Sequence, residues 1–148
     1  MAPANAAAAA EPAWERLVLF DGVCGFCDRA VRWLLARDVE GRLRFAPLQG
    51  RTAAALRLRH PEIPSDLDSI VYVEACGGQE RVYLRSDAAL QIAAAIGAAP
   101  RLRRVAARLP RRLRDVAYAA FARIRYRAFG RLDSCRAPLP AERARFLD

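Results

Sequence analysis

The chain has 148 residues, 54% of them hydrophobic, which suits one globular domain with a core of its own. It carries 25 basic residues, all arginine, against 16 acidic ones, so its net charge is +9, and the lack of lysine excludes Schiff-base chemistry. No run approaches the roughly 18 consecutive apolar residues of a membrane span. We interpret the alanine-rich residues 1–14 as a disordered lead-in and not a secretory signal, and we expect a cytoplasmic protein.

Four strands and three helices are expected in the first 97 residues, beginning with the apolar run Arg16–Phe20. After Asp21–Gly22, apolar residues recur at helical spacing from Cys24 to Asp38. The later strands are expected at residues 42–48, 68–75 and 80–85, and the later helices at residues 51–60 and 87–96. Ser86 is the expected N-cap of the last of these helices, and Gly97 ends it.

The resulting order, β-α-β-α-β-β-α, predicts an α/β fold with a mixed four-stranded sheet. A strand–helix–strand start implies a parallel pair joined by a right-handed crossover. The turn at residues 76–79, which holds two glycines, implies an antiparallel hairpin. We expect residues 15–97 to form this domain and residues 98–148 to be a helical extension packed on it as one structural unit.

The extension is rich in arginine, with 11 arginines and one acid, Asp115, between Arg101 and Arg131. Pro110 is suited to the first turn of a helix. The helix is expected to turn one apolar stripe toward the α/β domain, made of Leu113, Val116, Ala117, Ala120, Phe121, Ile124 and Ala128. Its arginines are compatible with a nucleic acid or an anionic membrane as partner, but a solvated basic face is favoured, since aromatic residues are few and no binding motif is present.

Two cysteines, Cys24 and Cys27, stand where the first strand passes into the first helix. A thiolate is the species that attacks a disulfide, and a helix N-terminus favours negative charge. We therefore predict that Cys24, at the first turn, is the nucleophile. Cys27, one turn deeper and more buried, is the predicted resolving thiol. Asp21 either takes a proton from Cys27 or caps the helix, and the sequence leaves both roles open.

Other uses of the cysteines are less well supported. A structural zinc site needs four ligands, often as two close pairs, and neither Cys76 nor Cys135 has a cysteine or histidine at ligand spacing. His60 is distant in sequence, and Asp28 stands where c-type haem attachment needs histidine. No metal or cofactor is expected. A cysteine metal site and a non-catalytic basic module remain the alternatives to thiol–disulfide exchange.

The segment FDGVCGFC resembles the DCC family of predicted thiol-disulfide oxidoreductases, named for an aspartate and two cysteines, here Asp21, Cys24 and Cys27. Further matching segments are RFAPLQG at 44–50, DSIVYV at 68–73, LRSDAAL at 84–90, LRDVAYAAFARIRYRAFG at 113–130, and Cys135. The resemblance implies a thioredoxin-like fold and exchange with a protein or small-molecule thiol or disulfide.

The resemblance also suggests residues that line the site. They are Gly25 and Phe26 between the cysteines, Asp68 and Ser69 at the third strand, Ser86 and Asp87 at the third helix, and Tyr118, Arg125 and Tyr126 on the last helix. For the third-helix pair, capping is the alternative; for the last three, packing and surface charge. Unlike thioredoxins, the chain has no proline at residues 67–69, so the usual backbone clamp for an extended substrate is in doubt.

Overall fold

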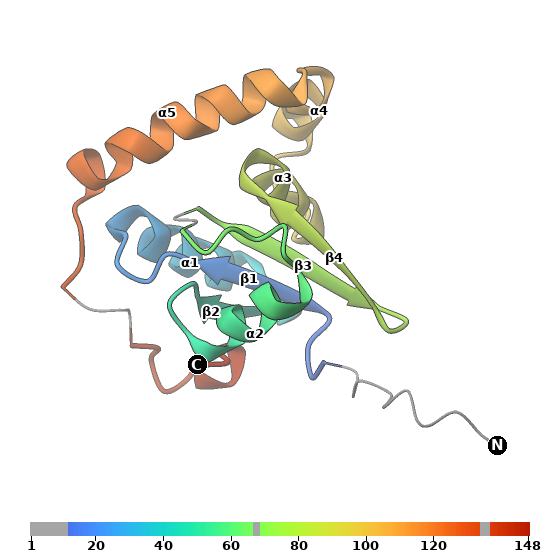
Figure 1. Ribbon diagram of the computed structural model, residues 1–148, viewed down its shortest axis with the longest axis vertical. Coiled ribbons are helices and arrows are strands. Elements are labelled where there is room, and N and C mark those ends of the chain that lie inside the picture. The colour runs from blue at the N-terminus through green and yellow to red at the C-terminus, as the bar shows by residue number, and fades with distance from the viewer. Residues whose placement is uncertain (1–11, 67–68, 134–136) are drawn as a thin grey trace.

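Four strands form one sheet in the computed structural model, which describes residues 12–66, 69–133 and 137–148 (Figure 1). The strands β1 to β4 span Arg16–Phe20, Leu43–Pro47, Val71–Cys76 and Gln79–Leu84. The helices α1 to α5 span Gly25–Arg37, Arg51–Arg59, Arg85–Ala95, Pro100–Arg108 and Arg111–Phe129, and a short 3-10 helix, η1, spans Arg143–Arg145.

The strand order in the sheet is β2-β1-β3-β4. Strand β1 pairs in parallel with β2 and antiparallel with β3, and β3 and β4 form the predicted hairpin. Gly77 and Gly78, in the hairpin turn, have positive φ angles of 58° and 76°, which glycine adopts without strain. The mixed four-stranded α/β architecture predicted from the sequence is therefore confirmed, and it is thioredoxin-like.

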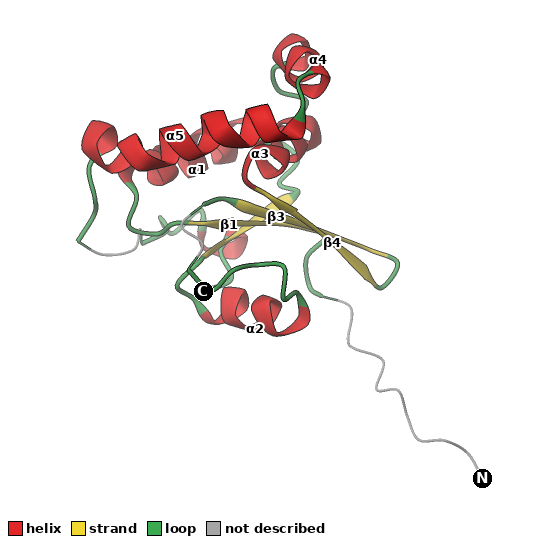
Figure 2. Cartoon of the chain, turned by 45° about the horizontal axis from the view of Figure 1, so that its top comes forward, coloured by secondary structure: helices red, strands yellow, loops and turns green. Residues whose placement is uncertain are grey.

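Helices cover both faces of the sheet, with α1, α3 and α5 on one face and α2 on the other (Figure 2). Strand β1 serves both layers because successive side chains point to opposite faces. Leu17 and Leu19 pack in the cluster on the α2 side, whereas Val18 and Phe20 pack on the α1 and α3 side. Trp14, which the expected lead-in included, is buried in the α2-side cluster, so the packed chain begins before residue 15.

The expected N-cap of α3 is wrong. The helix begins at Arg85, its N-cap is Leu84, and no side chain caps it. Ser86 lies inside the first turn, and its hydroxyl donates to Oδ1 of Asp115 on α5 at 2.5 Å. A partner on a neighbouring helix thus replaces the backbone N–H that a capping serine would bind.

The expected inward face of α5 is wrong for most of its residues, although Phe121 of the predicted stripe does pack against Phe26 of α1. Leu113, Val116 and Ile124 of the predicted stripe are 54%, 66% and 54% exposed, whereas Arg125 is 2% exposed. The helix is turned so that Tyr118 and Arg125 face the domain. There, the Tyr118 hydroxyl accepts the Ile70 N–H, and Arg125 donates to the Asp21 carboxylate. Specific polar partners, and not hydrophobicity alone, set the orientation of this helix.

Two further features of the C-terminal half were not predicted. Helix α4 is an additional helix, which begins with Pro100 at its first turn. Near the end of the chain, Phe146 bridges to Phe45, and the Leu147 N–H donates to the Phe45 carbonyl at 3.0 Å. This segment therefore covers β2, which lies at one edge of the sheet.

Candidate redox site

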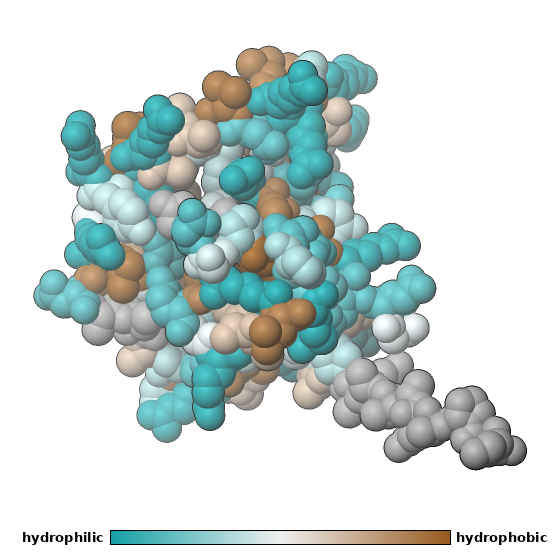
Figure 3. All heavy atoms as spheres, viewed as in Figure 1, coloured by the Kyte–Doolittle hydropathy of each residue, from teal (hydrophilic) through white to brown (hydrophobic). Residues whose placement is uncertain are grey.

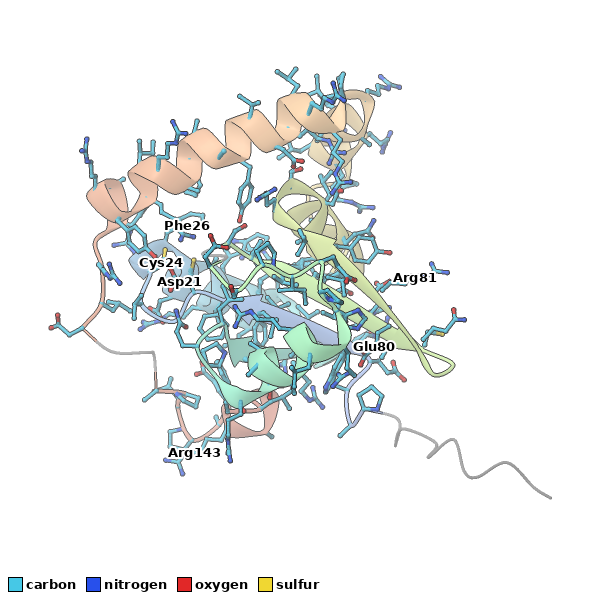
Figure 4. All side chains as sticks on the ribbon, viewed as in Figure 1. Asp21, Cys24, Phe26, Glu80, Arg81 and Arg143 are labelled. Atoms are coloured by element: carbon cyan, nitrogen blue, oxygen red, sulfur yellow. The ribbon has the colours of Figure 1, made fainter. Side chains whose placement is uncertain are left out.

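Cys24 lies where β1 passes into α1 (Figure 4), and Cys27 follows in the first turn of α1. Cys24 is the N-cap of α1, with extended backbone angles, and its Sγ accepts the Cys27 N–H at 3.3 Å. The cysteines approach each other to 3.1 Å, and both are free thiols. The pair is thus within reach of an intramolecular disulfide, and the thiol sulfur of Cys24 takes the place of an ordinary capping oxygen.

The relative burial of the two cysteines differs from the prediction. Cys24 is 0% exposed and Cys27 is 9% exposed. Cys27, which lies one turn further into the helix and was expected to be the more buried, is therefore the less buried of the two. The cause is the segment that follows α5. The Gly25 N–H donates to the Gly130 carbonyl at 3.2 Å, the Leu132 N–H donates to the Val23 carbonyl at 2.6 Å, and Cys24 forms a backbone bridge with Arg131.

Asp21 is a buried carboxylate with four donors. Its Oδ1 accepts the Val23 N–H at 3.2 Å and the Gln49 side-chain amide at 3.0 Å. Its Oδ2 accepts an Arg125 guanidinium N–H at 3.2 Å and the Tyr126 hydroxyl. Of the two roles that the sequence left open, helix capping is excluded because Cys24 caps α1.

Arg125 brings a positive charge beside the thiols. Its Nη1 lies 3.8 Å from Cys27 Sγ, while its Nη2 contacts Asp21. Burial and the hydrogen bond to Cys24 raise the pKa of Cys27 to about 12, although the Arg125 charge acts to lower it. Burial and the bond to Asp21 likewise raise the pKa of Tyr126 to about 12. In the reduced pair, Cys27 therefore holds its proton tightly.

An apolar cavity of about 320 Å³ lies between α1, α3 and α5 and borders Cys27. Aromatic and alanine side chains line most of it, among them Phe26, Trp33 and Ala93. Arg125 and Cys27 bring polar atoms to its wall, whereas Cys24 is not among the lining residues. The ring of Phe26 is held by Phe121 and Phe129 of α5, with ring centroids 4.7 and 5.0 Å away.

The structure brings several predicted residues to this region. Tyr118 lines the cavity, and its hydroxyl accepts the Ile70 N–H at 3.3 Å. Burial raises the pKa of Tyr118. Ser69 is buried and lines a neighbouring hollow with Tyr118. Gly25, Arg125 and Tyr126 contact the covering segment, Cys27 or Asp21, as described above, and Phe26 lines the cavity.

Other predicted residues do not join the pair. Asp87 forms ion pairs with Arg111 and Arg114 of α5, each at 2.9 Å, and with Ser86 it ties α3 to α5. Asp68 and Cys135 lie outside the described residues. Cys76 is exposed at the hairpin.

No metal site is formed by the described part of the chain, in which no three histidine, cysteine, aspartate or glutamate side chains cluster suitably. His60 instead contacts Glu62 and Glu80 at 3.2 and 2.5 Å. Among the helices described, none is long and apolar enough to cross a membrane.

Two contributors to the site were missed. Gln49 accepts the Gly22 N–H at 3.2 Å and donates to Asp21, so it fixes the loop before the cysteines. Its place just after β2 is a signal, because the ends of parallel strands meet at one edge of a sheet. The segment 130–132 was missed because no local pattern indicates which residues will cover a site more than 100 positions earlier.

The sequence pattern of the DCC1-like thiol-disulfide oxidoreductases matches residues 18–131, which include the cysteine pair, Asp21 and Arg125. The chain belongs to the DCC1-like thiol-disulfide oxidoreductase family. No solved structure is significantly similar to it.

Two relatives extend this family assignment. The uncharacterized protein YuxK of Bacillus subtilis is 37% identical over 134 residues, which cover 90% of this chain and 94% of YuxK. A chloroplastic DCC family protein of Arabidopsis thaliana is 37% identical over 120 residues, covering 80% of this chain and 67% of that protein. A redox role for a DCC1-like protein of this kind is therefore supported, with thiols or disulfides as the general class of substrate.

Proposed function

We propose that Cys24 and Cys27 cycle between a dithiol and a disulfide and so exchange two electrons with a thiol or disulfide substrate. The observation that carries this proposal is the position of Cys24 Sγ at the N-terminus of α1, where it accepts the Cys27 N–H at 3.3 Å. Donors at this position favour a thiolate. Cys24 is then the nucleophile of the pair, and Cys27 is the partner that retains its proton.

Asp21 acts in this proposal by positioning other groups. Its four donors occupy both carboxylate oxygens, so a proton from Cys27 would have to displace one of them. The carboxylate instead holds Arg125 beside Cys27 Sγ. Loss of Asp21 should therefore shift the reduction potential of the pair through Arg125.

A redox titration tests the function directly. The protein is equilibrated in glutathione buffers and alkylated, and free thiols are counted by mass on the peptide that spans Cys24 and Cys27. A two-electron transition confined to this peptide is expected, near the range of roughly −120 to −270 mV that dithiol oxidoreductases cover. A protein with Cys76 and Cys135 both replaced by serine should titrate identically. Absence of a reversible Cys24–Cys27 disulfide would refute the function.

The proposed thiol–disulfide chemistry also favours one cellular compartment, the cytoplasm. A reduced, exchange-competent pair fits the cytoplasm, where glutathione and thioredoxin keep thiols reduced. We therefore retain cytoplasmic residence as part of the proposal, with the glutathione pool as one chemical source of electrons.

We also propose a second function, the docking of the protein to anionic membranes. The observation behind it is an exposed apolar surface on α4 and α5, here called the α4–α5 apolar surface, which comprises Leu102, Val105, Leu109, Leu113, Val116 and Ile124. Figure 3 shows brown apolar residues along this edge of the molecule, set among teal hydrophilic ones. Arginines adjoin these residues in the sequence, as in PRLRRVAAR of α4, so the surface is complementary to anionic headgroups.

Vesicle sedimentation tests this docking. Vesicles containing phosphatidylglycerol should bind the protein, and vesicles of phosphatidylcholine alone should not. The double substitution Leu102→Gln and Val105→Gln should abolish binding. Val39→Gln with Leu58→Gln, which changes two residues elsewhere that are even more exposed, should leave it intact. Failure to bind anionic vesicles, or binding to DNA or a second copy of the chain instead, would refute the docking.

A further inference from the structure

The cavity beside Cys27 defines a side from which a substrate can reach the pair. Cys24 is covered by the segment 130–132, whereas Cys27 borders the cavity. Trp33 and Ala89 also line the cavity and are solvent-exposed, so the cavity opens to the surface. In this conformation, a molecule in the cavity meets the sulfur of Cys27 before that of Cys24.

The lining of the cavity indicates the chemical class of that molecule. Its wall is almost entirely apolar, and burying polar groups there without partners would be costly. Its volume, about 320 Å³, is at the small end of the range for small-molecule sites. An apolar body of a few carbons fits this space better than a charged peptide side chain does.

The backbone along the cavity argues against an extended peptide. Ile70 lines the cavity, and both of its backbone polar groups are already used. Its N–H donates to the Tyr118 hydroxyl at 3.3 Å, and its carbonyl accepts the Arg85 N–H at 3.3 Å. A peptide strand would therefore find no free main-chain partner at this residue.

We infer that the cavity binds the apolar body of a small-molecule thiol, and that the substrate sulfur bonds to Cys27. This inference rests on the proposed function, because it requires the Cys24–Cys27 disulfide. It replaces the nucleophile assignment expected from the sequence and proposed above. Here Cys27 carries the substrate, and Cys24 is the thiolate that leaves when the disulfide opens and that attacks Cys27 when the disulfide closes again.

The substrate thiolate, drawn toward Arg125, attacks Cys27 Sγ of the disulfide. A bond between substrate sulfur and Cys27 forms, the Cys24–Cys27 bond breaks, and the electron pair passes to Cys24 Sγ. Cys24 is the better leaving group because its sulfur lies at the helix N-terminus and accepts the Cys27 N–H. A second substrate thiolate then attacks the bound substrate sulfur, which gives the substrate disulfide and releases Cys27 as a thiolate. Each of the two cysteine thiolates takes up one proton, which balances the two protons that the substrate thiols lost on ionisation.

The test compares two thiols of similar size, butanethiol and 2-mercaptoethanol, as reductants of the oxidised protein. Each rate is taken at equal thiolate concentration and divided by the rate of the same thiol with free hydroxyethyl disulfide, which removes intrinsic reactivity. We expect butanethiol to be favoured about tenfold or more, the size of effect that a few buried methylenes produce. Acid quenching and fragment masses should place the transient mixed disulfide on Cys27.

Two neighbouring substitutions on α3 provide the matched control. Ala93 lines the cavity, whereas Ala94 lines a different hollow toward α4. Ala93→Leu should lower the normalised rate with butanethiol by more than that with 2-mercaptoethanol, so that most of the preference for butanethiol is lost. Ala94→Leu should alter neither rate. Urea unfolding of both variants verifies that each is folded under the conditions of the assay.

The outcomes separate this inference from the proposed function. Equal normalised rates for the two thiols, a preference that survives Ala93→Leu, or a mixed disulfide on Cys24 would overturn the inference while the pair still cycles. If the pair formed no reversible disulfide in glutathione buffers, both the inference and the proposed function would be overturned. The glutathione titration is carried out without butanethiol, so it tests the proposed function separately.

Discussion

Arg125 has the largest fully buried side chain of the described residues, and Asp21 is its buried counter-charge. Removing one member of a buried ion pair leaves the other charge without its partner, which costs about 3–5 kcal/mol. Arg125→Met should therefore lower the free energy of unfolding by about that amount in urea titrations. Arg112→Met, an exposed change on the same helix, should alter it by less than about 0.5 kcal/mol.

The Arg125 prediction has an internal check. If the loss comes from an uncompensated charge, Asp21→Asn with Arg125→Met should be less destabilising than the sum of the two single changes. Strictly additive losses would show that the two side chains do not act as a pair.

Protonation of Cys27 should make the stability depend on pH. Its thiol has a pKa of about 12 in the folded protein and 9.0 in the unfolded chain, so the unfolded state loses this proton first. The stabilisation is fully present below pH 9 and is lost as the pH rises toward 12. Between pH 9 and 10, this thiol alone should reduce the free energy of unfolding by about 1 kcal/mol.

The measurement is urea unfolding of the reduced protein at both pH values, with Cys27→Ala as the comparison. The tyrosines ionise near 10.0 in the unfolded chain, so each contributes less than Cys27 in this window, and the comparison with Cys27→Ala cancels their contribution. The variant should lose less stability than the natural sequence over the same step. Parallel decreases in the two proteins would contradict the raised pKa of Cys27.

The reactive residues themselves were predictable, because a short motif at a strand–helix junction specifies both type and position. Their relative burial was not. Cys24 is covered by backbone from residues 130–132, and the charge beside Cys27 comes from Arg125. The apolar pattern of the helix places Arg125 outside the apolar stripe, and only the family resemblance suggested that it lines the site. Contacts that span about a hundred residues have no local signature.

At the scale of elements, α1 and the end of α5 meet at Gly25. A Cβ added to this residue would collide with the Phe129 carbonyl oxygen, so the covering segment would have to move. Gly25→Ala should therefore reduce the free energy of unfolding by about 1–3 kcal/mol, although alanine is intrinsically the better helix former. It should also increase the rate at which Cys24 is alkylated by iodoacetamide in the reduced protein.

Cys76 serves as the internal reference for that experiment, because it is exposed at the hairpin far along the chain from Gly25. Its alkylation rate should be the same in both proteins. An unchanged rate for Cys24, measured against Cys76, would mean that the segment after α5 does not control access to the pair.

Element boundaries were largely predictable, and element faces were less so. The strand at Arg16–Phe20 and the hairpin follow from apolar runs and glycine turns, which are local properties. The orientation of α5 does not follow from such properties. The apolar pattern alone does not show that Arg125 has a buried carboxylate to pair with, or that Leu113 and Val116 remain exposed.

At the scale of the whole molecule, the end of the chain protects the sheet. Phe146 packs its ring against Phe45 and Phe20, with centroids 5.6 and 6.1 Å away, and its segment pairs with the edge strand β2. This coverage was not predictable, because the pairing residues lie about 100 positions apart. It matters because an uncovered edge strand is a site for pairing with other chains.

Phe146→Ala should therefore have two effects. It should lower the free energy of unfolding by about 3 kcal/mol, the low end of the range for a buried phenylalanine, since this ring is half-buried. It should also increase light scattering on heating, because β2 loses its cover and can pair with another copy. Leu139→Ala, at an exposed position nearby in the chain, is the matched control and should change neither quantity. If the two substitutions behaved alike, the C-terminal segment would be a passive tail, and β2 would have to be protected from aggregation in some other way.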